Sequence, residues 1–193
     1  MGPLEGFADV WGSAFLKHVY GYTPSVASYL PSLIFVGMCF GAPLLSYIAE
    51  KTGFYITTII GAAIVMALVF GLLVAGALTL NTITIYFVLV GICCAYQILA
   101  IYKASTYVPE TLSGLTTAIA NMIIMSFGYA FHSIIGYIVN INGGPDSTQA
   151  LTYGVGVIPL TLCIGAIGFL AVGYLGRSRT SGLNQETAME GVA

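Results

Sequence analysis

Long apolar stretches separated by short polar segments are the dominant pattern of this chain of 193 residues. A helix needs about 20 mostly apolar residues to cross the hydrocarbon core of a bilayer. The alternation with a period of two that marks a membrane β-barrel is absent. The sequence therefore predicts an all-α membrane protein with five full transmembrane helices, at residues 29–49, 55–76, 83–102, 115–139 and 153–175.

The two ends of the chain depart from this pattern. Residues 3–16 are weakly apolar and too short to cross a membrane alone, so they are interpreted as a partial helix whose beginning is missing. They also lack the basic start and the long apolar stretch of a signal peptide. From Arg177 onward the chain is polar, which predicts a disordered tail. The expected domains are a membrane unit over residues 1–176 and a cytoplasmic tail over residues 177–193.

Composition narrows the functional class. Only 6% of the residues are charged and 58% are hydrophobic, whereas a soluble domain carries about 25% charged residues. This excludes a soluble globular enzyme, a disordered chain and a nucleic-acid-binding protein. The motifs GxSxG and HExxH, a Gly-rich phosphate loop and metal-binding Cys/His spacings do not occur. We therefore expect no enzyme, no catalytic residues, no cofactor and no metal.

The charged residues mark the ends of the predicted helices and orient them. If residues 29–49 run from outside to inside, four basic residues lie on the cytoplasmic side, and only Lys17 lies outside. The four are Lys51, Lys103, Arg177 and Arg179. This distribution obeys the positive-inside rule. We expect a multi-pass protein of the cell membrane, the bacterial inner membrane in particular, with a cytoplasmic C-terminus.

Small residues inside the spans are interpreted as packing residues. Gly37 and Gly41 form a GxxxG pair, which we assign to ordinary close packing rather than to a dimer interface. The cysteines are interpreted in the same way, as small apolar side chains. They are Cys39, Cys93, Cys94 and Cys163.

Polar side chains within the apolar segments are the candidates for a transport path, because polar groups at membrane depth are costly and tend to face a cavity or the bundle interior. The spans at 55–76 and 153–175 hold no ionisable side chain of Asp, Glu, Lys, Arg or His and are expected to be lipid-facing or structural. The path candidates are Glu5, Asp9, Tyr96, Gln97, Asn121 and His132.

Two groups of these candidates leave alternatives open. Asn121, Gly128 and His132 share one face of their helix, and the glycine leaves room for a ligand, a water chain or a neighbouring helix. Asn121 and His132 are either interhelical hydrogen-bonding groups or transport residues. Glu5 and Asp9 lie four residues apart, so at the membrane edge one carboxyl of the pair could hold a proton. The pair could equally lie in water at a loop.

Three segments resemble motifs of the major facilitator superfamily. Residues 41–53 resemble its loop signature of a glycine, an acidic–basic pair and a further glycine, here Gly41, Glu50, Lys51 and Gly53. Residues 109–121, which begin Pro-Glu-Thr-Leu-Ser-Gly, are similar to the loop and helix start before its eleventh helix. Residues 6–16 resemble the outer end of its seventh helix.

The resemblance covers nearly all of residues 1–176 and implies helices seven to twelve, the C-terminal half of a twelve-helix transporter. It also implies that helices seven, eight, ten and eleven surround the path, with nine and twelve outside. Glu50 and Lys51 stand where the family usually has Asp and Arg. This weakens a cytoplasmic salt-bridge latch, because lysine cannot make a planar bidentate contact.

The expected function is secondary transport of a small solute by alternating access, with the acidic pair or His132 as candidates for proton coupling. Two halves around a central path are the basis of this mechanism. Three explanations of the half length remain: a fragment whose partner half is encoded separately, an inactive remnant, or a homodimer. The rival class is a non-transporting membrane scaffold. Expected partners are the lipid bilayer, a small solute, and a missing N-terminal half or a second copy.

Overall fold

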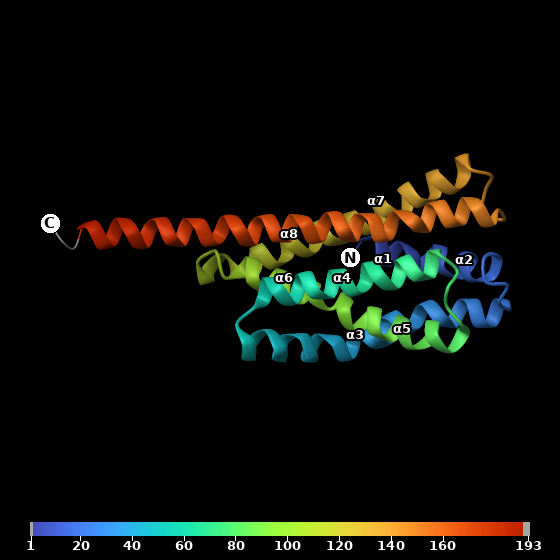
Figure 1. Ribbon diagram of the computed structural model, residues 1–193, viewed down its shortest axis with the longest axis horizontal. Coiled ribbons are helices and arrows are strands. Elements are labelled where there is room, and N and C mark those ends of the chain that lie inside the picture. Colours follow the sequence, from blue (N-terminus) through green and yellow to red (C-terminus); the bar gives the residue numbers. More distant parts are fainter. Residues whose placement is uncertain (1, 191–193) are drawn as a thin grey trace.

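The computed structural model describes residues 2–190, with side chains described as far as Ala171 (Figure 1). This part of the chain is helical throughout and contains no strand. Its elements are α1 (Gly2–Gly6), η1 (Phe7–Trp11), α2 (Gly12–His18), α3 (Pro24–Thr52), α4 (Tyr55–Val74), α5 (Leu80–Cys94), α6 (Tyr96–Ser105), α7 (Glu110–Ile141) and α8 (Thr148–Glu190).

Five segments are long and apolar enough to cross a membrane. They correspond in order to the five predicted spans, so the all-α architecture with five membrane-length helices is confirmed. The segments are Pro24–Thr52, Tyr55–Val74, Leu80–Ser105, Glu110–Ile141 and Thr148–Ala171.

The ends of α3 follow from local residue chemistry. Pro24 occupies the first turn, where its missing N–H costs nothing, and the Thr23 hydroxyl accepts a hydrogen bond from the Val26 backbone at 3.5 Å. The helix ends at Gly53, which has a φ of +71° and donates its N–H to the Ala49 carbonyl. Glycine takes this left-handed conformation without a Cβ clash. The chain can therefore turn into α4 within three residues.

The predicted continuous helix at 83–102 is wrong in one respect, because it breaks at Ala95 into α5 and α6. The Ala95 N–H bonds to the Ile92 carbonyl at 3.3 Å, and the Ile98 N–H bonds to the Ala95 carbonyl at 3.0 Å. These bonds span three residues instead of four, so the helix tightens locally. Residues 92–98 contain neither proline nor glycine, and nothing in the sequence predicts the break.

The N-terminal segment forms one helical rod from Gly2 to His18, with a π-helical turn at η1. Far from being peripheral, it supplies Phe7 to the centre of the bundle. The Phe7 ring is fully buried and makes edge-to-face contacts with Phe70 of α4 at 5.0 Å and Phe87 of α5 at 5.7 Å between ring centroids. Such aromatic pairs stabilise a core beyond their buried area. The weakly apolar segment is therefore a core element.

Glycines bring α3 and α5 into backbone contact. A Cβ at Gly37 or Gly41 would overlap the backbone of α5 at Val88 and Ile92, and a Cβ at Gly91 would overlap the Ile34 carbonyl of α3. The GxxxG pair of α3 is thus used within the chain, and its assignment to close packing is confirmed. Cys93 and Cys94 are also buried, but Cys39 and Cys163 are exposed, so the packing interpretation is wrong for those two cysteines.

The described part of the chain is apolar inside and outside. It buries no polar or charged residue completely, and large apolar side chains also point outward from the helices. Examples exposed by more than 60% are Phe40, Leu68, Ile85, Leu160, Ile164 and Ile167. A surface of this kind is costly in water and suits a lipid environment. The fold is compatible with a multi-pass membrane location.

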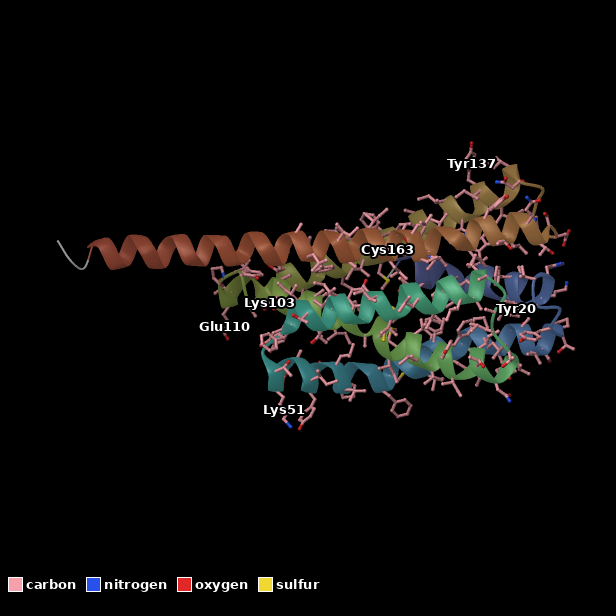
Figure 2. The ribbon with its side chains drawn as sticks, in the orientation of Figure 1. Tyr20, Lys51, Lys103, Glu110, Tyr137 and Cys163 are labelled. Atoms are coloured by element: carbon pink, nitrogen blue, oxygen red, sulfur yellow. The ribbon has the colours of Figure 1, made fainter. Side chains whose placement is uncertain are left out.

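The charged residues labelled in Figure 2 lie at one end of the bundle. Lys51, Lys103 and Glu110 lie at one end, whereas Tyr20 and Tyr137 lie at the other (Figure 2). Helix α8 is assigned through most of segment 177–193, and its C-terminal part extends beyond the bundle (Figure 1). The predicted disordered tail falls where side chains are not described, and residues 191–193 lie outside the described residues, so that prediction stays untested.

Candidate functional site

A pocket of about 290 Å³ lies among α1, α4, α6, α7 and α8. Its wall is mainly apolar and includes Phe127 and Phe131 of α7 and Phe169 of α8. Two path candidates, Tyr96 and Gln97, line it at the start of α6, directly after the break at Ala95. The break therefore sets the position from which both side chains face the pocket. The polar lining residues are Tyr96, Gln97 and Thr161.

Gln97 is the polar group of this wall with unused hydrogen-bonding capacity. Its Nε2 lies 3.9 Å from Met38 Sδ, a weak acceptor. Its Oε1 is buried and has no hydrogen-bond partner among the described residues. A buried polar atom without a partner carries a desolvation cost. Because Oε1 is buried, the Gln97 amide must turn about its last side-chain torsion before this acceptor can bond to a molecule in the pocket, and it then recovers that cost.

The roof of the pocket is a glycine-lined contact between α1 and α7. Gly2 packs on the Phe127 and Gly128 backbone, and Gly6 lies against His132. Across the same contact, the Glu5 side chain lies over Gly128, so that a Cβ there would be 2.6 Å from Glu5 Oε2. Gly128 thus makes room for a neighbouring helix, one of the three uses that its spacing left open.

His132 lies one turn further along this contact. Its ring packs against Trp11 at 5.9 Å between centroids, and its backbone carbonyl accepts a hydrogen bond from Trp11 Nε1 at 3.3 Å. The Nδ1 atom is buried and has no hydrogen-bond partner within the described residues. The fold therefore brings Glu5 and His132, 127 positions apart in sequence, to successive turns of one interface.

The structure places the other two candidates, Asn121 and Asp9, away from the pocket and the α1–α7 contact. Asn121 is exposed on α7, and Asp9 is exposed on η1. Asn121 shares the helical face of Gly128 and His132, but α1 covers that face only from Phe127 onward. Neither Asn121 nor Asp9 lines the pocket.

The two glycines of the loop motif have structural roles, in helix packing and in helix termination. Gly41 packs on Ile92 of α5, and Gly53 caps α3. Glu50 and Lys51 are both exposed. Lys51 Nζ lies 5.6 Å from the Tyr47 ring centroid, a cation–π contact within α3. No ion pair of Glu50 or Lys51 occurs among the described side chains.

Sequence reasoning missed several residues of this region. Gly6 and Trp11 entered only as parts of a resembling segment, and Gly2, Gly136 and Thr161 were not identified. The spacing of Gly2 and Gly6, four residues apart on one helical face, was a usable signal. Gly136 accommodates the Trp11 ring, with 3.1 Å between a Cβ there and Trp11 Cζ2. That contact had no signal in the sequence, because its partner is more than a hundred residues away.

Among the described residues there is no group of three or more His, Cys, Asp or Glu side chains that could hold a metal ion. Compared with known proteins, the chain matches no family model, no curated protein and no solved structure. The described residues form a helical bundle with five membrane-length helices, compatible with a multi-pass membrane protein. The bundle contains a mainly apolar pocket.

Proposed function

We propose that the chain is the C-terminal-half unit of a secondary transporter resembling the major facilitator superfamily, and that it moves a small solute across the cell membrane. The observation that carries the proposal is the convergence of polar residues around one place. Tyr96 and Gln97 line the pocket. Glu5 and His132 do not line it, but they lie in the adjoining α1–α7 contact, from which Gly2 and Phe127 reach the pocket. Polar groups are costly in a membrane and collect where a solute or ion passes.

The uncovered face of α7 supports a second half or a second copy as the partner. Of the five membrane-length helices, α7 is the least buried. The exposed side chains of this face include the polar residues Ser126, Tyr129, Ser133 and Tyr137, whereas exposed Asn121 lies on the face of Gly128 and His132. Such residues avoid lipid contact. We propose that this face packs against the partner unit, and that the solute path runs between the two.

Proton coupling is assigned within this proposal to Glu5 and His132 rather than to Asp9. The first two side chains are partly buried in the α1–α7 contact, whereas Asp9 is exposed. A proton bound at this contact would alter the packing of α1 on α7, which is the link that coupling requires. The orientation belongs to the same proposal, with the end that carries Lys51 and Lys103 in the cytoplasm.

Uptake into proteoliposomes tests the function. Vesicles that contain the purified chain are given an inward pH gradient and a mixture of small cellular solutes, and their contents are identified by mass spectrometry. We expect at least one solute to accumulate above protein-free vesicles and to be lost when an ionophore removes the gradient. No accumulation of any solute, with native helicity retained by circular dichroism, would contradict transport by the chain together with a second copy of itself.

Three variants test the coupling residues in the same assay. Glu5→Gln and His132→Ala are expected to abolish the dependence of uptake on the pH gradient, and Asp9→Asn is expected to retain it. Unchanged pH dependence in Glu5→Gln and His132→Ala would remove the proton-coupling assignment while leaving transport intact.

A further inference from the structure

We propose that the pocket binds an uncharged, flat aromatic molecule of about two fused rings that carries one N–H or O–H donor. This inference rests on the proposed function only for the statement that the molecule is the transported solute. Binding itself requires no gradient and no partner half, so it can be measured separately.

The chemistry of the wall selects an uncharged ligand. No Asp, Glu, Lys, Arg or His lines the pocket in the described part of the chain. A charged molecule would lose its hydration there without a compensating partner, and a sugar would bury several hydroxyl groups unpaired. The rings of Phe127, Phe131 and Phe169 favour another aromatic ring, which can make offset or edge-to-face contacts with them.

The polar groups of the pocket wall favour a ligand that carries a single hydrogen-bond donor. The Thr161 hydroxyl is already directed to the backbone of its own helix, with the carbonyls of Val157 and Ile158 at 3.0 and 2.9 Å. Gln97 Oε1 is an acceptor that has no hydrogen-bond partner among the described residues. A ligand with one donor satisfies Gln97 Oε1 once the amide turns toward the pocket, and it meets an otherwise mainly apolar wall in which Tyr96 is the other polar residue besides Thr161.

The volume of the pocket limits the size of the ligand. The pocket measures about 290 Å³, roughly twice the 150 Å³ of an apolar protein cavity that binds benzene. Two fused rings therefore fit, and indole combines that size with one N–H donor. The probes are 5-fluoroindole and 5-fluoro-1-methylindole, which differ in the donor and in one methyl group.

Fluorine NMR of the purified chain in lipid nanodiscs measures the binding, with empty nanodiscs as the blank for partition into lipid. We expect saturable binding of 5-fluoroindole and binding of the methylated probe that is about fivefold weaker, as for the loss of one hydrogen bond. In Gln97→Leu the two probes should bind within about twofold of each other, because the acceptor is gone.

Two tryptophan variants separate the pocket from the outer surface. A Cβ at Gly165 of α8 or at Gly61 of α4 meets nothing within 4 Å, but only Gly165 lines the pocket. Gly165→Trp should fill the space and weaken binding at least about tenfold. Gly61→Trp should bind as the unchanged chain does.

Several results would overturn the inference. One is a fluorine NMR signal of 5-fluoroindole that is the same with empty nanodiscs and with nanodiscs that contain the chain, at every concentration of the probe. This result is expected if a lipid chain occupies the pocket. Others are equal binding by Gly165→Trp and the unchanged chain, or a preference for 5-fluoroindole that survives in Gln97→Leu. Saturable binding without uptake of 5-fluoroindole into proteoliposomes supports the pocket assignment and contradicts only its role as cargo. Uptake of other solutes without such binding supports transport and overturns the ligand class.

Discussion

The indole Nε1 of Trp11 donates a hydrogen bond to the backbone carbonyl of His132 over 3.3 Å, between residues 121 positions apart. The same indole ring fills the space beside Gly136, which has no side chain of its own. Together the two contacts hold the N-terminal rod on α7. They keep Glu5 over Gly128 and His132 beside Gly6, so the geometry of the candidate site depends on Trp11.

Two substitutions of Trp11 measure separately what its hydrogen bond and its ring packing contribute to stability. Trp11→Phe keeps a ring beside Gly136 and removes the donor, so we expect a loss of about 0.6 kcal/mol, the average for interhelical hydrogen bonds in membrane proteins. Trp11→Ala also empties the space and should cost several times more. Unfolding by SDS in mixed micelles, followed by circular dichroism, measures both. Equal losses in the two variants would show that the hydrogen bond, not the ring, holds α7.

A methyl group at Gly128 should displace the Glu5 carboxyl from its place over α7. Its Cβ would lie 2.6 Å from Glu5 Oε2, the end of a flexible side chain that can turn aside, so the cost should lie near the lower end of overpacking, about 1 kcal/mol. Gly114→Ala is the matched control on the same helix, where a Cβ meets nothing within 4 Å. The control should be neutral or slightly stabilising because alanine favours helices.

Removal of the Glu5 side chain tests whether its overlap with the new methyl group causes the stability loss of Gly128→Ala. Glu5→Ala combined with Gly128→Ala should recover most of the lost stability, so the loss in the double variant is smaller than the sum of the two single losses in a double-mutant cycle. Additive losses would mean that the two residues do not meet, and the assignment of this contact would be wrong.

Membrane orientation can be read from chemical labelling of the loops. With the four native cysteines replaced by alanine, Thr106→Cys in the α6–α7 loop and Pro145→Cys in the α7–α8 loop lie at opposite ends of the bundle. The positive-inside rule predicts that a membrane-impermeant maleimide labels only the cysteine at 145 in intact cells. Broken cells should show labelling of both. Labelling at 106 in intact cells would reverse the proposed orientation.

Alkaline pH should weaken the end of the bundle that carries Tyr20, in the loop between α2 and α3. Burial raises the pKa of the Tyr20 phenol, and the hydroxyl donates a hydrogen bond to the Leu73 carbonyl at 2.7 Å. Because the folded state holds this proton more tightly than the unfolded state, the contribution is complete below about pH 10 and is lost as the pH rises through the raised value.

Tyr20→Phe should therefore lower stability at neutral pH and flatten its decline above about pH 10. SDS titrations at pH 7, 9 and 11 measure the two slopes, with Tyr153→Phe as the comparison, since Tyr153 is exposed on α8. An identical alkaline decline in the unchanged chain and in Tyr20→Phe would assign the pH dependence to other groups.

The sequence by itself determined the number of membrane-length helices, their order and the ends at which charges gather. These properties follow from apolar length and from the positions of a few residues such as Gly53, all of which act within one helix or turn. The close packing of Gly37 and Gly41 was also predictable, because a small-residue spacing admits few other uses.

The tertiary structure decided which residues meet. The break at Ala95, the central position of Phe7 and the contact of Glu5 with Gly128 depend on packing between elements that are distant in sequence. Helical periodicity assigns a residue to a face but not to the neighbour that covers it. Asn121 and His132 share a face, yet one is exposed and the other packs on Trp11, because α1 covers only part of α7.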